Sequence, residues 1–171
     1  GVPAMAVDEL QKGRVYPGEH HQWSVQAAQS VSSGTYADIA STEIQLPPLP
    51  VIVAQARVTT PASTTAEVRI FDPFVPPSGA GTDPVVVPAA SDGIVRFVWE
   101  HPYTTGWDYD PDFPDTIDAV TRLHWQVRRA SGVGTISAYP PWSFYFVSNR
   151  AVRDETTTGG GTFVVNGSGV W

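Results

Sequence analysis

The acidic segment of residues 108–115 is the part of the sequence best suited to hold a metal ion. It carries four carboxylates, at Asp108, Asp110, Asp112 and Asp115. Carboxylates that converge in one loop can bind Ca²⁺, which takes about six to eight oxygen ligands in flexible geometry. The segment has no glycine at its sixth position, and Pro111 and Pro114 stiffen it, unlike a helix-flanked calcium loop. Ca²⁺ binding is therefore one hypothesis for this segment, and a solvated acidic loop is the alternative.

Aromatic side chains are concentrated in the same predicted loop, which runs over residues 101–116. They are Tyr103, Trp107, Tyr109 and Phe113. Rings beside carboxylates can stack on sugar faces while the acids accept hydrogen bonds from hydroxyl groups. The same side chains also make anchors in protein interfaces. We therefore expect a glycan-binding or protein-binding surface here, with simple packing of the loop onto the core as the remaining alternative.

A polar stripe accompanies the clearest amphipathic segment, residues 121–127. Apolar positions at Leu123, Trp125 and Val127 alternate with polar ones, which is typical of a strand with one buried face. The polar positions are Arg122, His124, Gln126 and, just beyond, Arg128. Because the forked donors of arginine seek carboxylates, the stripe is a candidate interface. Ordinary solvent-facing alternation is the alternative.

Catalytic motifs are absent from the sequence, and we predict no catalytic residue. The Gly167-Ser168-Gly169 run lacks the frame of a nucleophile elbow, and neither a phosphate loop nor a dinucleotide fingerprint occurs. The four histidines, His20, His21, His101 and His124, have no further ligands at metal-binding spacing. Paired carboxylates for glycoside hydrolysis stay open, because their separation is a property of the folded chain.

Short strands must position all of these residues. Apolar alternation or β-branched runs predict about nine strands. Their expected ranges are 22–27, 42–46, 51–60, 66–71, 93–100, 121–127, 135–139, 142–146 and 162–165. Residues 72–84 and 101–116 are expected to be long loops, and a helix-like pattern is confined to residues 7–12. The absence of βα alternation predicts an all-β fold, an antiparallel sandwich of jelly-roll-like type.

The chain is expected to consist of one sandwich with two extended arms. Residues 1–21 form the first arm, in which residues 1–4 resemble a non-native extension before Met5. Residues 22–152 form the sandwich. Residues 153–171 combine a glycine-rich linker with a terminal strand or hairpin. We expect the arms to dock on this domain or on neighbouring subunits and to become ordered there.

Composition restricts the classes of partner. The net charge of −7 argues against nucleic acid, because phosphate binding requires a basic face. The lack of cysteine excludes disulfides and thiolate metal sites. No apolar run approaches the roughly 18 residues of a membrane span, and the start of the chain has no signal-sequence pattern. We therefore expect neither nucleic acid nor membrane as a partner, and no cofactor other than the Ca²⁺ considered above.

Several short motifs resemble those of a family of phage proteins. They are Gly-Thr-Tyr-Ala-Asp-Ile at 34–39, Leu-His-Trp-Gln-Val at 123–127, Gly-Thr-Ile at 134–136 and Ser-Asn-Arg-Ala-Val at 148–152. This pattern is similar to that of the small β-sandwich domains of tailed-bacteriophage virion proteins, found in minor tail proteins, fibres and capsid appendages. The resemblance implies a structural or adhesive role in a symmetric oligomer, often a trimer, and supplies no catalytic residues. The two long loops and the segment after Val152 depart from the family pattern.

The leading hypothesis is a non-enzymatic structural protein of a bacteriophage virion. It would decorate the capsid or form part of a tail or fibre, assembled in the host cytoplasm from copies of itself and other virion proteins. A carbohydrate-binding receptor module that uses residues 101–116 on a cell-surface glycan is the alternative from another class. A small hydrolase is the third.

Overall fold

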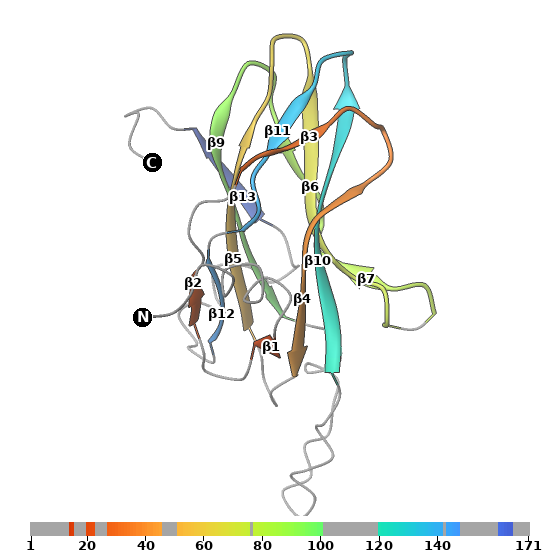
Figure 1. The fold of residues 1–171 in the computed structure, drawn as a ribbon, viewed down its shortest axis with the longest axis vertical. Helices are drawn as coiled ribbons and strands as arrows, with labels where there is room; N and C mark the ends of the chain where they lie inside the picture. The colour runs from red at the N-terminus through yellow and green to blue at the C-terminus, as the bar shows by residue number, and fades with distance from the viewer. Residues whose placement is uncertain are drawn as a thin grey trace, which may run out of the picture.

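The structure, a computed structural model, is an all-β sandwich of two sheets packed face to face (Figure 1). It describes residues 14–15, 20–22, 27–45, 51–75, 77–100, 120–141, 143–147 and 161–165. No helix in this part of the chain is long and apolar enough to cross a membrane.

The first sheet has six strands built around the long strand β10. Its strands are β1 (Arg14–Val15), β4 (Ala37–Gln45), β10 (Val120–Ser131), β6 (Thr65–Asp72), β7 (Ala80–Gly81) and β8 (Val85–Val87). Their order is β1-β4-β10-β6-β7, and β8 also pairs with β6. The pairs are antiparallel, except that β1 runs parallel to β4. Strand β10 therefore has both of its edges paired.

The second sheet has seven strands and is centred on β5. Its strands are β13 (Gly161–Val165), β9 (Asp92–Glu100), β5 (Val51–Thr59), β11 (Ile136–Ala138), β3 (Gln29–Val31), β12 (Ser143–Val147) and β2 (His20–Gln22). The main order is β13-β9-β5-β11-β3, and β12 pairs with both β5 and β2. All of these pairs are antiparallel.

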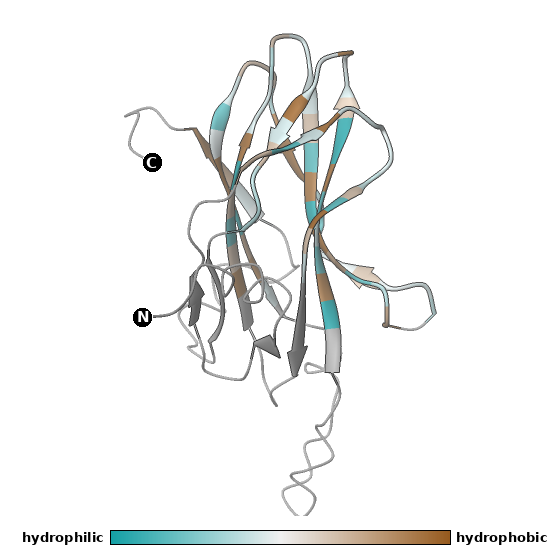
Figure 2. Ribbon diagram, viewed as in Figure 1, coloured by the Kyte–Doolittle hydropathy of each residue, from teal (hydrophilic) through white to brown (hydrophobic). Residues whose placement is uncertain are grey.

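The core between the sheets follows from the period-two patterns of their strands. In β6, buried and half-buried positions alternate over the whole strand, which places Ala66, Val68 and Ile70 inside. Apolar residues accordingly recur along the central strands of both sheets (Figure 2). Two aromatic rings of this core, Phe97 and Trp125, meet edge to face with centroids 5.5 Å apart, and so join the two sheets.

The loops at one end of the sandwich, at the top of Figure 1, are tied together by hydrogen bonds. The Thr60 hydroxyl donates to the Pro88 carbonyl at 2.6 Å and accepts from the Ser91 amide at 3.1 Å. In the neighbouring turn the buried Thr64 hydroxyl accepts from the Gly134 amide at 2.9 Å. The β5–β6 and β10–β11 connections each cross from one sheet to the other at this end. These hydrogen bonds therefore hold the two sheets together there.

The all-β sandwich expected from the sequence is confirmed, with some differences in its elements. The expected loop 72–84 contains β7, because the Thr82 amide donates to the Ile70 carbonyl while its hydroxyl accepts from the Ile70 amide, each at 3.0 Å. The short strands β1, β3 and β8 were not expected. Of the expected strand 22–27, only Gln22 lies in a described strand, β2, and β4 begins five residues before the expected range 42–46. The helix-like segment 7–12 and the loop 101–116 lie outside the described residues. The proposed division of the chain into arms and sandwich stays a prediction, although β13 pairs directly with β9.

Candidate functional site

The outward side of strands β4, β10 and β6 carries a continuous array of charged, amide and aromatic side chains, which we call the polar face. Its residues are Tyr36, Asp38, Glu67, Arg69, Phe71, His124, Gln126 and Arg128. The strand register sets the rows of this array: Gln126 lies between Asp38 and Arg69, and Arg128 lies opposite Glu67. A bulge between Trp125 and Gln126 shifts the β4–β10 register by one residue, so that Gln126 lies opposite Asp38.

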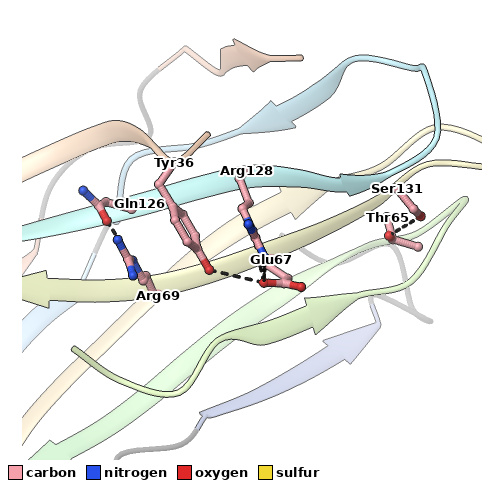
Figure 3. Close-up of polar contacts among 7 residues, drawn as sticks. All are labelled: Tyr36, Thr65, Glu67, Arg69, Gln126, Arg128 and Ser131. Atoms are coloured by element: carbon pink, nitrogen blue, oxygen red, sulfur yellow. Dashed lines mark hydrogen bonds and ion pairs between the residues drawn. The ribbon is translucent and has the colours of Figure 1, made fainter. Parts of the chain in front are cut away.

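One carboxylate organises the first part of the polar face. Glu67 Oε2 accepts hydrogen bonds from Arg128 Nη2 at 2.8 Å, from Arg128 Nε at 3.2 Å and from the Tyr36 hydroxyl at 3.3 Å (Figure 3). The hydrogen bonds to Glu67 raise the pKa of Arg128. Burial, followed by the negative charge of Glu67, raises the pKa of Tyr36 above its usual value. The phenol therefore stays protonated and keeps donating to the carboxylate.

Arg69 is held in place by rings and by an amide. Its guanidinium carbon lies 3.9 Å from the centroid of the Tyr36 ring and 4.4 Å from that of Phe71. Its Nε donates to Gln126 Oε1 at 2.8 Å (Figure 3). Gln126 Nε2 in turn donates to Asp38 Oδ1 at 2.8 Å. Within the described residues, the two terminal nitrogens of Arg69 have no hydrogen-bond acceptor. The result is a planar cation fixed in orientation, with donors left over for a partner.

His124 extends the polar face along β10. Its Nδ1 lies 3.0 Å from Asp38 Oδ2, an ion pair whenever the imidazole is protonated. Of the stripe expected from the sequence, His124 and Arg128 thus share one network, while Arg122 lies further along β10 with an exposed side chain. The carboxylates of this face are already engaged, Asp38 by an amide and an imidazole and Glu67 by a guanidinium.

The other expected site residues belong to the predicted loop 101–116. The aromatic set Tyr103, Trp107, Tyr109 and Phe113 and the acidic set Asp108, Asp110, Asp112 and Asp115 lie outside the described residues. Among the residues that are described, no three His, Asp or Glu side chains come together as a metal site would require. Ca²⁺ binding stays a prediction for the acidic loop.

Five members of the polar face were not expected from the sequence: Tyr36, Asp38, Glu67, Arg69 and Phe71. Tyr36, Glu67 and Arg69 belong to segments distant from the β10 stripe, and only the register of the strands brings them together. A signal for two of them was present, because Glu67 and Arg69 alternate with the apolar residues of β6. Extending the outward stripe across neighbouring strands would have found them.

A second polar cluster lies on the outer side of the other sheet. Arg57 makes a forked pair with Asp92 across β5 and β9, with Nε and Nη2 each 2.8 Å from a carboxylate oxygen. The Thr59 hydroxyl also donates to Asp92 Oδ1 at 3.1 Å, and the guanidinium stacks on the Tyr139 ring at 4.8 Å. The hydrogen bonds from Arg57 lower the pKa of Asp92 below its usual value.

We expect Asp92→Asn to remove an acid-sensitive part of the stability. A carboxyl whose pKa is lower when folded stabilises above its unfolded pKa of about 3.9, and this contribution is lost as pH falls through the folded pKa. Because the pair is exposed, we expect the free energies of unfolding of wild type and Asp92→Asn to differ by roughly 0.2–1 kcal/mol at neutral pH. Urea unfolding between pH 2 and pH 7 should show wild type more stable than Asp92→Asn at neutral pH and equal to it at the acid end. The control is Asp83→Asn at an exposed carboxylate outside this cluster; equal pH profiles for the two variants would contradict the assignment.

Comparison with family models, with curated proteins and with solved structures returns no match for this chain.

Proposed function

We propose that this chain is a non-enzymatic structural protein of a tailed-bacteriophage virion, a capsid appendage or a component of a tail or fibre. It acts by self-association, with a trimer favoured, and by docking on other virion proteins. Its place is the virion, after assembly in the host cytoplasm. The motifs at residues 34–39 and 123–127 that resemble such proteins support this proposal, and both lie in or beside the polar face.

The observation that carries the proposal is the fixed orientation of Arg69. A side chain that loses little conformational freedom on binding makes a more favourable contact, and Arg69 is already held by Tyr36, Phe71 and Gln126. Arginine and tyrosine are also enriched among the residues that dominate interface energies. The polar face therefore has the properties of a preformed protein-contact surface.

The chain's negative net charge indicates what this surface contacts. An acidic protein of charge −7 offers carboxylates on a second copy, and carboxylates are the acceptors that a planar guanidinium binds best. A contact of this kind between copies uses the donors of Arg69 that are not engaged within the described residues.

We expect Arg69→Ala to weaken self-association by about 30-fold, which corresponds to a hot-spot loss of about 2 kcal/mol. Sedimentation equilibrium or light scattering after size exclusion measures it over a concentration series. The matched control is Arg57→Ala, an arginine of β5 on the other sheet, with the same change of charge.

Two results would contradict the proposal. One is a wild-type chain that stays monomeric in the concentration series and is missing from virions purified from its source. The other is an equal loss of association in Arg69→Ala and Arg57→Ala, which would show a charge effect without a defined face. A fixed copy number per virion, measured by quantitative mass spectrometry, would support it.

A further inference from the structure

Strand β13 completes the edge of the second sheet in a specific register. Its five residues pair antiparallel with β9, from Gly161 opposite Phe97 to Val165 opposite Gly93. It is the outermost strand of that sheet and lies beside β8 of the first sheet. Strand β13 thus closes one side of the sandwich (Figure 1).

The contact between β13 and β9 has the form of a peptide-binding seat. The Phe163 side chain is half-buried against the core, and its ring covers Gly93 so closely that a Cβ there would lie 2.4 Å from the ring. In the reverse direction, a Cβ at Gly161 would lie 2.6 Å from the Phe97 ring. Two positions without side chains, one on each strand, therefore permit this approach. The seat is matched to one short sequence, Gly-Thr-Phe-Val-Val.

Absence of β13 from the β9 edge would destabilise the folded protein. Without β13, the β9 edge would present unpaired backbone groups, and the core beside Phe97 would lose the cover of Phe163. A strand of this sequence is therefore needed at β9 in every folded copy. The contacts are the same whether that strand comes from the same copy or from another.

Two sequence features indicate supply from another copy. Residues 156–160, Thr-Thr-Thr-Gly-Gly, have the composition of a linker, and the stretch from Val147 to Gly161 can span about 45 Å when extended. Strand β13 also has no charge and no proline to block pairing, and Val164 and Val165 are 62% and 58% exposed. An uncharged, apolar edge strand is the type that pairs between chains.

We propose that the β9 edge is a strand-acceptor site that binds residues 161–165 of a second copy of this chain. Exchange in one direction around a ring gives a closed oligomer, and reciprocal exchange gives a dimer. This inference rests on the proposed assembly role and adds the site and the segment that connect the subunits.

The chain has no cysteine, so engineered cysteines can report the source of the strand. Ile94 and Val164 are direct partners in the β9–β13 pairing, at a separation typical of disulfides. Two chains, Ile94→Cys and Val164→Cys, are co-expressed with different tags, oxidised and run under denaturing, non-reducing conditions. We expect a disulfide-linked heterodimer in a yield above that of random collision, because β13 of one copy on β9 of another holds the two cysteines together.

Two further samples complete the design. Val133→Cys co-expressed with Val164→Cys gives the background from random collision, since Val133 lies on an exposed turn outside this seat. The double variant Ile94→Cys/Val164→Cys should run as a covalent dimer or larger ring. Bands of monomer size only, no disulfide at all, or a heterodimer yield equal to the background would each overturn the proposal. If such a chain still associates in solution and Arg69→Ala weakens that association, strand exchange fails while the proposed function stands.

Discussion

Replacing Phe97 with alanine is expected to lower the free energy of unfolding by about 3–5 kcal/mol, the cost of removing a large aromatic side chain from a packed core. The ring is fully buried and contacts Trp125 edge to face. It also lies directly under Gly161 of β13. Its loss would therefore loosen both the contact between the sheets and the support of the edge strand. For a domain of ordinary stability this is a large fraction of the total.

Chemical denaturation with two probes separates these effects. Tryptophan fluorescence and far-ultraviolet circular dichroism should shift together to lower urea concentration in Phe97→Ala. Phe97→Leu keeps most of the side-chain volume and should lose about 1.5 kcal/mol or less. The double-mutant cycle with Trp125→Phe measures the ring contact, for which we expect about 0.5–1.5 kcal/mol. A loss below about 1 kcal/mol in Phe97→Ala would contradict the packing described for this core.

Most of the long strands could be predicted from the sequence because burial determines their pattern, whereas β4 was expected only from residue 42 onward. In β6, β9 and β10 one face is covered by the opposite sheet, so apolar residues recur at every second position. The short strands β1, β3, β7 and β8 gave no such signal. Strand β7 has two residues and is held by hydrogen bonds of Thr82 to Ile70, far from it in sequence. Its formation depends on a partner and not on its own pattern.

The candidate site was predicted only in part, for a related physical reason. Alternation in β10 indicated that His124 and Arg128 face outward, which the structure shows. Which acid each one meets depends on strand register, and a one-residue shift moves every side chain to the other side of the sheet. The bulge at Trp125 and Gln126 changes that register within a single strand. The alternation within one strand therefore predicts which side chains face outward. It does not identify the residues of neighbouring strands that they contact.

The polar face and the strand seat would have different roles in an assembly. Arg69 and its neighbours lie on the first sheet, and β13 lies at the edge of the second. Exchanged strands bury backbone hydrogen bonds and an aromatic anchor, so they mainly slow dissociation. A charged face mainly sets the orientation and the rate of encounter. Added salt should therefore slow association through the polar face and leave the exchanged strands in place.

Replacing Gly132 with alanine is expected to lower the free energy of unfolding by about 2–4 kcal/mol. Gly132 has a φ of +85°, a conformation that costs a residue with a side chain about 1–2 kcal/mol. A Cβ there would also lie 2.1 Å from the Ser63 carbonyl oxygen and 2.8 Å from Thr64 Cα, and both are backbone atoms. The turns must then separate, which breaks the 2.9 Å bond from the Gly134 amide to the Thr64 hydroxyl.

The adjacent residue gives a matched control for this turn. Val133 is 92% exposed, so Val133→Ala should change the free energy of unfolding by less than about 0.5 kcal/mol. Amide hydrogen exchange should also show faster exchange at Gly134 in Gly132→Ala, because its amide loses the acceptor. A Gly132→Ala variant as stable as wild type, or one with unchanged protection at Gly134, would show that the turns of β5–β6 and β10–β11 are not joined as described. The sheets would then be held at this end by their core side chains and by the hydrogen bonds of Thr60.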